Sequence, residues 1–93
     1  MRLKARIDGN QQQIVAALRR AGATVEHLHQ VGKGVPDLLV GYRHRTYLLE
    51  CKPPKGKLTK DEARWIQTWL GGTVYIVRSE LDAYAAIGLE IIR

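Results

Sequence analysis

A chain of 93 residues suits one small domain, and we expect a single domain over residues 1–93. Fifteen Lys and Arg against nine Asp and Glu give a formal net charge of +6, which favours nucleic acid as the partner, because basic side chains release counterions condensed on phosphates; a basic surface with no such partner is the alternative. The single cysteine, Cys51, excludes an intrachain disulfide and a cysteine-based zinc site.

The sequence contains no apolar run as long as a signal peptide or a membrane span, so we expect a cytoplasmic protein without a membrane partner. A domain of this size buries a small share of its surface, and its core is marginal. Association of two copies would supplement such a core. A homodimer is therefore expected.

The first half of the chain is predicted to form a helix and three strands. Apolar side chains recur at helical spacing over residues 10–21, and Gly22 follows where a helix commonly ends. A weak alternation of apolar and polar residues predicts a first strand over residues 24–31. Residues 38–40 and 46–51 are apolar runs on either side of a turn, which predicts a β-hairpin.

The second half is predicted to form a helix, a strand and a further helix. Residues 53–57 read as a basic loop, because its two prolines cannot donate hydrogen bonds to a sheet. Thr59 and Glu62 match a capping box at the start of a helix that we expect to end at Gly71, and residues 74–77 read as a buried strand. The resulting order, α-β-β-β-α-β-α, predicts an α/β fold with a small mixed sheet flanked by helices.

Three charged residues, Asp37, Glu50 and Lys52, form the candidate catalytic set. Glu50 and Lys52 are two residues apart, so they point to the same face of a strand while Cys51 points to the other. Antiparallel pairing within the hairpin brings Asp37 close to Glu50. The two carboxylates suit a magnesium ion, with the backbone carbonyl of Cys51 as a further candidate ligand. Lys52 would orient the attacking water or offset charge that develops in the transition state.

The alternative is that these three charges have no catalytic role. Glu50 and Lys52 would then be an ordinary pair on an exposed strand, and Asp37 would be a turn residue that follows a proline. Neighbouring apolar residues such as Leu38 and Leu49 argue against this alternative, because burying a charge without a partner is costly.

The segments Gly34-Val35-Pro36-Asp37 and Glu50-Cys51-Lys52 resemble the signature of PD-(D/E)XK nucleases, and more closely that of the VRR-NUC type. The resemblance covers most of the chain, from the helix around Gln11 to the strand at residues 74–77. It implies a single VRR-NUC-like domain with a restriction-endonuclease-like α-β-β-β-α-β core. It also implies a dimeric enzyme that uses Mg²⁺ or Mn²⁺ to cut branched DNA such as Holliday junctions.

Two positions depart from the pattern of this family. Gln11 stands where the family often has a metal-binding glutamate in the first helix. Its amide oxygen is a candidate metal ligand but carries no charge, so occupancy of a second metal position stays open. Glu62 stands where the family tends to have glutamine. We favour a local capping role for Glu62, with a catalytic role as the alternative.

Seven basic residues in loops and near helix starts are predicted to flank the candidate site and to hold the DNA backbone on either side of the cut. They are Lys33, Arg43, Arg45, Lys55, Lys57, Lys60 and Arg64. A solvated rim without DNA contacts is the alternative.

Aromatic and histidine residues are given mainly structural roles. Trp65 and Trp69 lie one helical turn apart, and we expect packing in the core or at a dimer interface, because Trp69 falls on the apolar stripe. Stacking on unpaired bases is the alternative. His27, His29 and His44 lack the further ligands of a zinc site, and we expect surface polar residues or phosphate contacts.

The leading hypothesis is a metal-dependent DNA endonuclease, homodimeric and similar to Holliday junction resolvases. The second hypothesis is a non-catalytic DNA-binding module that keeps the nuclease fold, and the uncharged Gln11 is the reason to consider it. The third is a protein-interaction domain whose basic surface meets an acidic partner.

Overall fold

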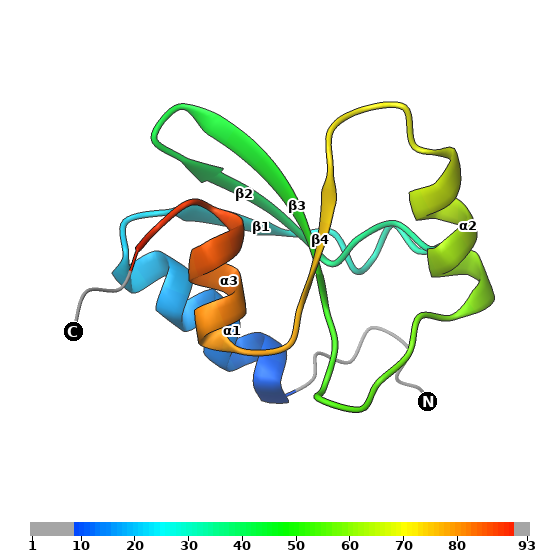
Figure 1. The fold of residues 1–93 in the computed structure, drawn as a ribbon, viewed down its shortest axis with the longest axis horizontal. Helices are drawn as coiled ribbons and strands as arrows, with labels where there is room; N and C mark the ends of the chain where they lie inside the picture. The colour runs from blue at the N-terminus through cyan, green and yellow to red at the C-terminus, as the bar shows by residue number, and fades with distance from the viewer. Residues whose placement is uncertain (1–8, 91–93) are drawn as a thin grey trace.

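The computed structural model describes residues 9–90, in which three helices surround a four-stranded sheet (Figure 1). In chain order the elements are α1 (Gly9–Arg20), β1 (Thr24–His27), β2 (Leu38–Tyr42), β3 (Arg45–Cys51), α2 (Lys60–Thr68), β4 (Val74–Val77) and α3 (Glu80–Ala86). The strands lie in the order β1-β2-β3-β4. Strand β2 is antiparallel to both β1 and β3, and β4 is parallel to β3. The predicted element order and the mixed α/β sheet are confirmed.

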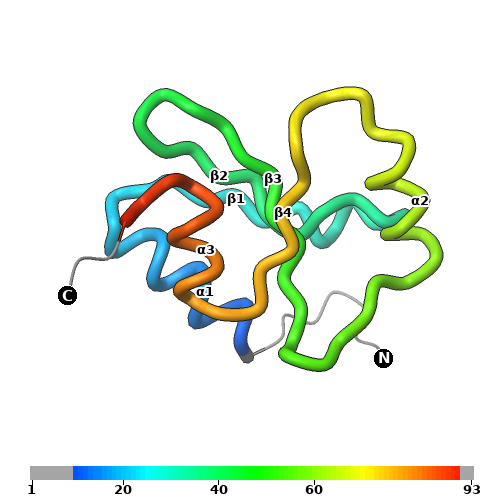
Figure 2. The backbone as a smooth tube through the Cα atoms, viewed as in Figure 1, coloured from blue at the N-terminus to red at the C-terminus, as the bar shows by residue number. Residues whose placement is uncertain are grey.

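One face of the sheet forms the hydrophobic core with α1 and α3, which lie side by side (Figure 2). Helix α1 contributes Ile14 and Leu18 to this core. The strands contribute alternate residues such as Val40 and Leu49, because successive side chains of a strand point to opposite faces. Within residues 9–90, no helix is both long enough and apolar enough to cross a membrane.

Helix α2 lies across the sheet from α1 and α3 and is not part of the core (Figure 1). It has no buried residue and ends at Thr68, so it is shorter than predicted. Trp69 is 43% exposed and Leu70 is 98% exposed, so the expected packing of Trp69 in the core is wrong. The Trp69 ring stacks instead on Trp65, with centroids 4.5 Å apart. The apolar residues of α2 are therefore partly exposed to solvent and pack against each other instead of against the core.

Strand β1 ends at His27, four residues before the predicted end at Val31. The chain turns at this point, because the Val31 N–H donates to the Leu28 carbonyl at 2.9 Å. The Leu28 N–H in turn donates to the backbone carbonyl of Asp37 at 2.7 Å. These bonds replace a longer strand with a loop that returns directly to Asp37.

The connection between β2 and β3 is a turn with Arg43 and His44 at its centre. Both residues have positive φ, 51° and 69°, as a tight two-residue hairpin turn requires. Tyr42 and Arg45 are therefore paired on either side of the turn, and the strands are longer than predicted. This register determines which residues meet at the other end of the hairpin.

Candidate active site

The β2–β3 hairpin brings Asp37 and Glu50 together at its open end. Leu38 pairs with Leu49, so Asp37 and Glu50 occupy the next positions along the two strands. The Cys51 N–H donates to Asp37 Oδ2 at 2.8 Å, which fixes the carboxylate beside the β3 backbone. The structure therefore places Asp37, Glu50 and the Cys51 backbone next to one another.

Lys52 follows on the same face of β3 as Glu50 and completes the cluster. Its Nζ lies 3.6 Å from Glu50 Oε2, and the Glu50 side chain is only 2% exposed. The backbone of Lys52 is held on both sides: its N–H donates to the Val77 carbonyl, and Asn10 Nδ2 donates to its carbonyl at 2.9 Å. Asn10 thus supports the site from α1, a role that the sequence reasoning did not assign to it.

Glu62 is the residue of this cluster whose role the sequence only partly indicated. The predicted capping box is present, since Thr59 Oγ1 accepts from the Glu62 N–H at 3.1 Å and Glu62 Oε1 accepts from the Thr59 N–H at 2.8 Å. The same Oε1 also lies 2.7 Å from Lys52 Nζ. The feature of the sequence that could have indicated this contact is the short loop between Lys52 and the capped helix. This loop brings the first turn of α2 back to the end of β3.

Gly34 explains how the loop before Asp37 can approach α2. Its φ is +86°, and a Cβ at this position would overlap the backbone carbonyl of Asp61. A glycine is therefore required, because any side chain would push the loop away from the first turn of α2. The Gly-Val-Pro-Asp segment is thus packed against the helix that supplies Glu62.

Burial controls the protonation of the two carboxylates. It raises the pKa of Asp37 above its usual range, although the hydrogen bond from the Cys51 N–H opposes this shift. Burial, with the charges of Asp37 and Glu62, raises the pKa of Glu50 to about 9. Glu50 is therefore protonated at neutral pH unless a further cation is present. A cation beside it would favour the ionised form.

Lys52 and Glu62 stabilise each other in their charged forms. Burial alone would lower the pKa of Lys52, but the hydrogen bond to Glu62 and the surrounding carboxylates raise it. Burial alone would also raise the pKa of Glu62, but the hydrogen bonds from Lys52 and from the Thr59 N–H lower it. At neutral pH this pair is ionised beside a protonated Glu50.

The donor atoms of the cluster fit a hard divalent cation better than zinc. Within residues 9–90, no group of three or more His, Cys, Asp or Glu side chains is arranged to hold a metal ion. Asp37 and Glu50 nevertheless form a pair of carboxylates, and magnesium commonly binds one or two carboxylates while it keeps several waters. Manganese accepts the same oxygen ligands. The high pKa of Glu50 indicates that the nearby cation, Lys52, does not offset burial and the neighbouring carboxylates.

Gln11 is buried in α1 but turns toward β1. It is 4% exposed, and its Nε2 lies 3.4 Å from His27 Nδ1. The rings of His27 and His29 are in edge contact, with centroids 5.7 Å apart. The contact with His27 gives the Gln11 amide a structural role. Its predicted role as a metal ligand stays a prediction.

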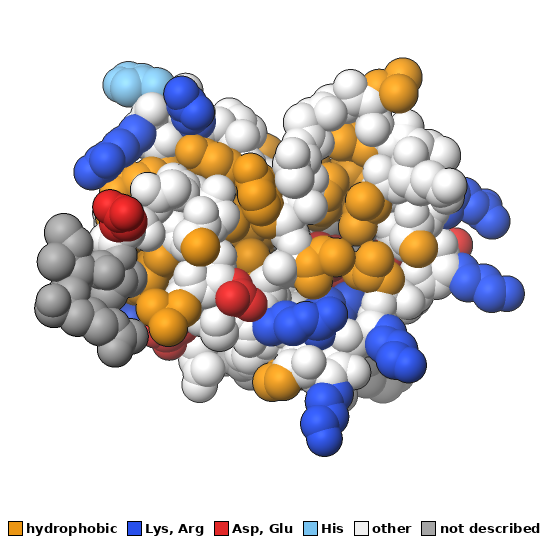
Figure 3. Space-filling model, in the orientation of Figure 1, with side chains coloured by type: hydrophobic (Ala, Val, Ile, Leu, Met, Phe, Trp, Pro, Cys, Tyr) orange, Lys and Arg blue, Asp and Glu red, His pale blue; other side chains and the backbone are white. Residues whose placement is uncertain are grey.

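The seven predicted DNA-binding residues fall into two groups. Five lie in the loops beside the cluster or on α2, namely Lys33, Lys55, Lys57, Lys60 and Arg64. Arg43 and Arg45 lie at the tip of the hairpin, about 17 Å along β3 from Glu50 at roughly 3.4 Å per residue, so they do not flank the cluster. Figure 3 shows Lys and Arg side chains over α2 and the adjoining loop, and another group at the hairpin tip.

The loop that carries Lys55 and Lys57 is held by Arg78. The Arg78 guanidinium donates to the carbonyls of Pro53 at 2.8 Å and Gly56 at 2.7 Å. Since Arg78 follows β4 directly, these bonds join the basic loop to the end of the sheet that carries the cluster. No local pattern of residues indicates this contact, because the partners lie more than 20 residues apart.

Comparisons of this chain with protein-family models, with curated proteins and with solved structures found no match. The resemblance to PD-(D/E)XK nucleases therefore depends on Asp37, Glu50, Lys52 and the order of the elements. The geometry of these residues supports a chemical role that can be tested directly.

Proposed function

We propose that this chain is a metal-dependent endodeoxyribonuclease of the PD-(D/E)XK type, which hydrolyses phosphodiesters in branched DNA such as Holliday junctions. The observation that carries the proposal is the cluster at the end of β3, in which Glu50 is buried and Asp37 and Lys52 are half-buried beside it. The net charge of +6 supports DNA as the substrate. The proposal includes action as a homodimer in the cytoplasm.

The chemistry assigned to each residue follows from its contacts. A bound Mg²⁺ or Mn²⁺ would polarise the scissile phosphate and lower the pKa of an attacking water. Asp37 and Glu50 would hold the ion through carboxylate oxygens, with the Cys51 carbonyl as a further oxygen. The Lys52 ammonium, which Glu62 holds in place, would donate to the water or to the phosphate oxygen that gains charge.

The basic residues beside the cluster would position the DNA backbone. Lys55 and Lys57 lie on the loop that Arg78 holds, and Lys60 and Arg64 lie on α2. Contacts of this kind fix the register of the DNA without reading its sequence. The arginines at the hairpin tip would contact DNA farther from the cut.

The test is cleavage of four-way-junction and duplex DNA with Mg²⁺ or Mn²⁺ by the wild-type chain, Asp37→Ala and Lys52→Ala. Arg20→Ala and Asp61→Ala are matched controls, since each removes an exposed charge that lies outside the cluster and outside the residues assigned to DNA. We expect each cluster substitution to lower the cleavage rate by about 100-fold or more, and each control to change it much less. Cleavage that survives both cluster substitutions would exclude the proposed chemistry.

A non-catalytic DNA-binding module is the second candidate function. The observation in its favour is Gln11, an uncharged residue whose amide contacts His27. This candidate predicts salt-dependent DNA binding without cleavage in either Mg²⁺ or Mn²⁺. Metal-dependent cleavage by the wild-type chain would exclude it.

A further inference from the structure

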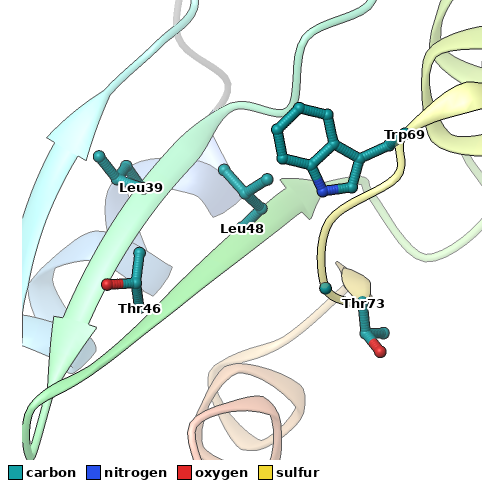
Figure 4. A pocket seen from close by; sticks show the side chains of 6 residues that line it. Leu39, Thr46, Leu48, Trp69 and Thr73 are labelled. Carbon is teal, nitrogen blue, oxygen red and sulfur yellow. The ribbon is translucent and has the colours of Figure 1, made fainter.

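An apolar groove of about 330 Å³ lies between the uncovered face of the sheet and the chain that follows α2 (Figure 4). It is lined by Leu39, Thr46, Leu48, Trp69, Gly72 and Thr73. Leu39 and Leu48 come from β2 and β3, and the Trp69 ring lies opposite them across the groove. Among the described residues 9–90, no charged side chain lines it.

Half of the large apolar side chains that are exposed within residues 9–90 lie in or next to this groove. Of the six, Leu39 and Trp69 line it and Leu70 directly follows Trp69. Ile76 pairs with Glu50 across β3 and β4, which places it on the uncovered face of the sheet. Contiguous exposed apolar surface of this kind marks a site of interaction.

The Trp69 ring is oriented by its neighbours and not by the core. It stacks on Trp65 at an interplanar angle of 17°. A Cβ on Gly71 would come within 2.6 Å of Trp69 Nε1, so the ring also packs closely against the backbone of Gly71. The groove is therefore a formed surface whose apolar wall stays exposed in a single chain.

The charge of the chain favours a second copy as the occupant. Two copies that each carry a net charge of +6 repel each other over most of their surface and can approach best through an uncharged patch. DNA would instead need cations at its phosphates, which the groove lining does not offer. The absence of charge thus separates this surface from the basic residues assigned to DNA.

Leu70 supplies the complementary feature on the same patch. It lies between the lining residues Trp69 and Gly72 in the sequence and is 98% exposed, so its side chain projects from the surface. A twofold interface uses the same patch on both copies, and it therefore needs a projection and a recess on one patch. Leu70 and the groove form such a pair.

We propose that two copies of the chain associate through this groove, with Leu70 of each copy packed into the groove of the other. The inference rests on the homodimer in the proposed function and names its surface. Leu48, on the groove floor, precedes Glu50 by two residues on the same face of β3, a separation of roughly 7 Å along the strand. The interface would therefore adjoin both catalytic clusters.

The test is sedimentation velocity over a range of concentrations, without DNA or metal, on the wild-type chain, Leu70→Asp and Leu81→Asp. Leu81 is the matched control, because it is an exposed leucine on α3, away from the groove. We expect the wild-type chain and Leu81→Asp to be dimers. Leu70→Asp should raise the dissociation constant by about 100-fold or more, since both leucines leave the interface together. Equal melting temperatures of the two variants would show that both are folded.

Three outcomes would overturn the inference. They are a monomeric wild-type chain, equal dissociation of both variants, and a Leu70→Asp chain that stays dimeric. Because the measurement uses neither DNA nor metal, its result is separate from the success or failure of the nuclease proposal.

Discussion

The Lys52 ammonium contacts carboxylates from two different elements, Glu50 on β3 and Glu62 on α2. Its position therefore depends on how α2 sits against the end of the strand. Glu62 uses one oxygen, Oε1, for both the Thr59 N–H and Lys52 Nζ, so the helix cap and the cluster are joined at a single atom. This arrangement makes Glu62 a positioning residue for Lys52.

Substitution of Glu62 tests this role. Glu62→Ala should lower kcat for DNA cleavage by about tenfold with little change in KM. The Lys52 ammonium would keep its charge but lose the contact that orients it. Glu62→Gln should recover most of the rate, since its amide oxygen can accept from the same two donors. Asp61→Ala is the control on the same turn. Equal kcat values for Glu62→Ala and Asp61→Ala would contradict the role.

Glu50 should make the metal-free protein less stable as the pH rises. Its pKa is about 9 when folded, against 4.5 as its ordinary value, so the folded state binds the extra proton between these limits. The contribution of Glu50 is thus complete below about pH 4.5 and is lost as the pH rises through about 9, with a slope of at most about 1.4 kcal/mol per pH unit.

The measurement is the free energy of unfolding from denaturant titrations between pH 5 and pH 9 in the presence of a chelator, with roughly one pH unit between points. Glu50→Gln, which has nearly the same shape and cannot titrate, should show a shallower decline than the wild-type chain. Parallel curves for the two proteins would mean that Glu50 is not protonated in the folded state.

Helix α2 is attached to the rest of the chain mainly through its first turn. It has no buried residue, and its contacts there are the Lys52–Glu62 pair and the close approach of Gly34 to the Asp61 backbone. A helix of nine residues gains little stability from its own hydrogen bonds. The position of α2 should therefore be sensitive to changes at either contact.

Gly34→Ala should detach α2, because the new methyl group would overlap the Asp61 carbonyl. Hydrogen exchange of the α2 amides should become faster, with less change in the core strands. Gly32→Ala is a close control, since Gly32 also has positive φ, +75°, but a Cβ there meets nothing within 4 Å. Similar exchange in both variants would show that backbone strain, and not overlap with the Asp61 carbonyl, causes the effect.

Local sequence patterns predicted the elements but not how α2 packs. The hairpin register followed from the alternation of residues and a turn, so the proximity of Asp37 and Glu50 could be expected. Helical spacing placed Trp69 on an apolar stripe, but spacing does not say what covers a stripe, and within residues 9–90 Trp69 remains 43% exposed. The end of β1 was missed because the bond from Leu28 to Asp37 joins distant residues.

At the scale of the whole molecule, the cationic side chains and the apolar groove lie on separate surfaces. Cationic side chains lie over α2, the adjoining loop and the hairpin tip (Figure 3), and the uncharged groove lies between the sheet and the chain after α2. Under the two proposals, one surface would bind DNA while the other would bind a second copy. Both surfaces meet at the end of β3, where the carboxylates lie.

The central claim is that Asp37 and Glu50 hold a divalent cation beside Lys52. The most direct measurement is anomalous scattering from a crystal of the chain soaked in Mn²⁺, with Asp37→Ala crystals soaked in the same way. The account predicts a manganese peak within bonding distance of both carboxylates, and none at this position in the variant. A wild-type crystal that binds no manganese there, or a peak that persists without the Asp37 carboxylate, would contradict it.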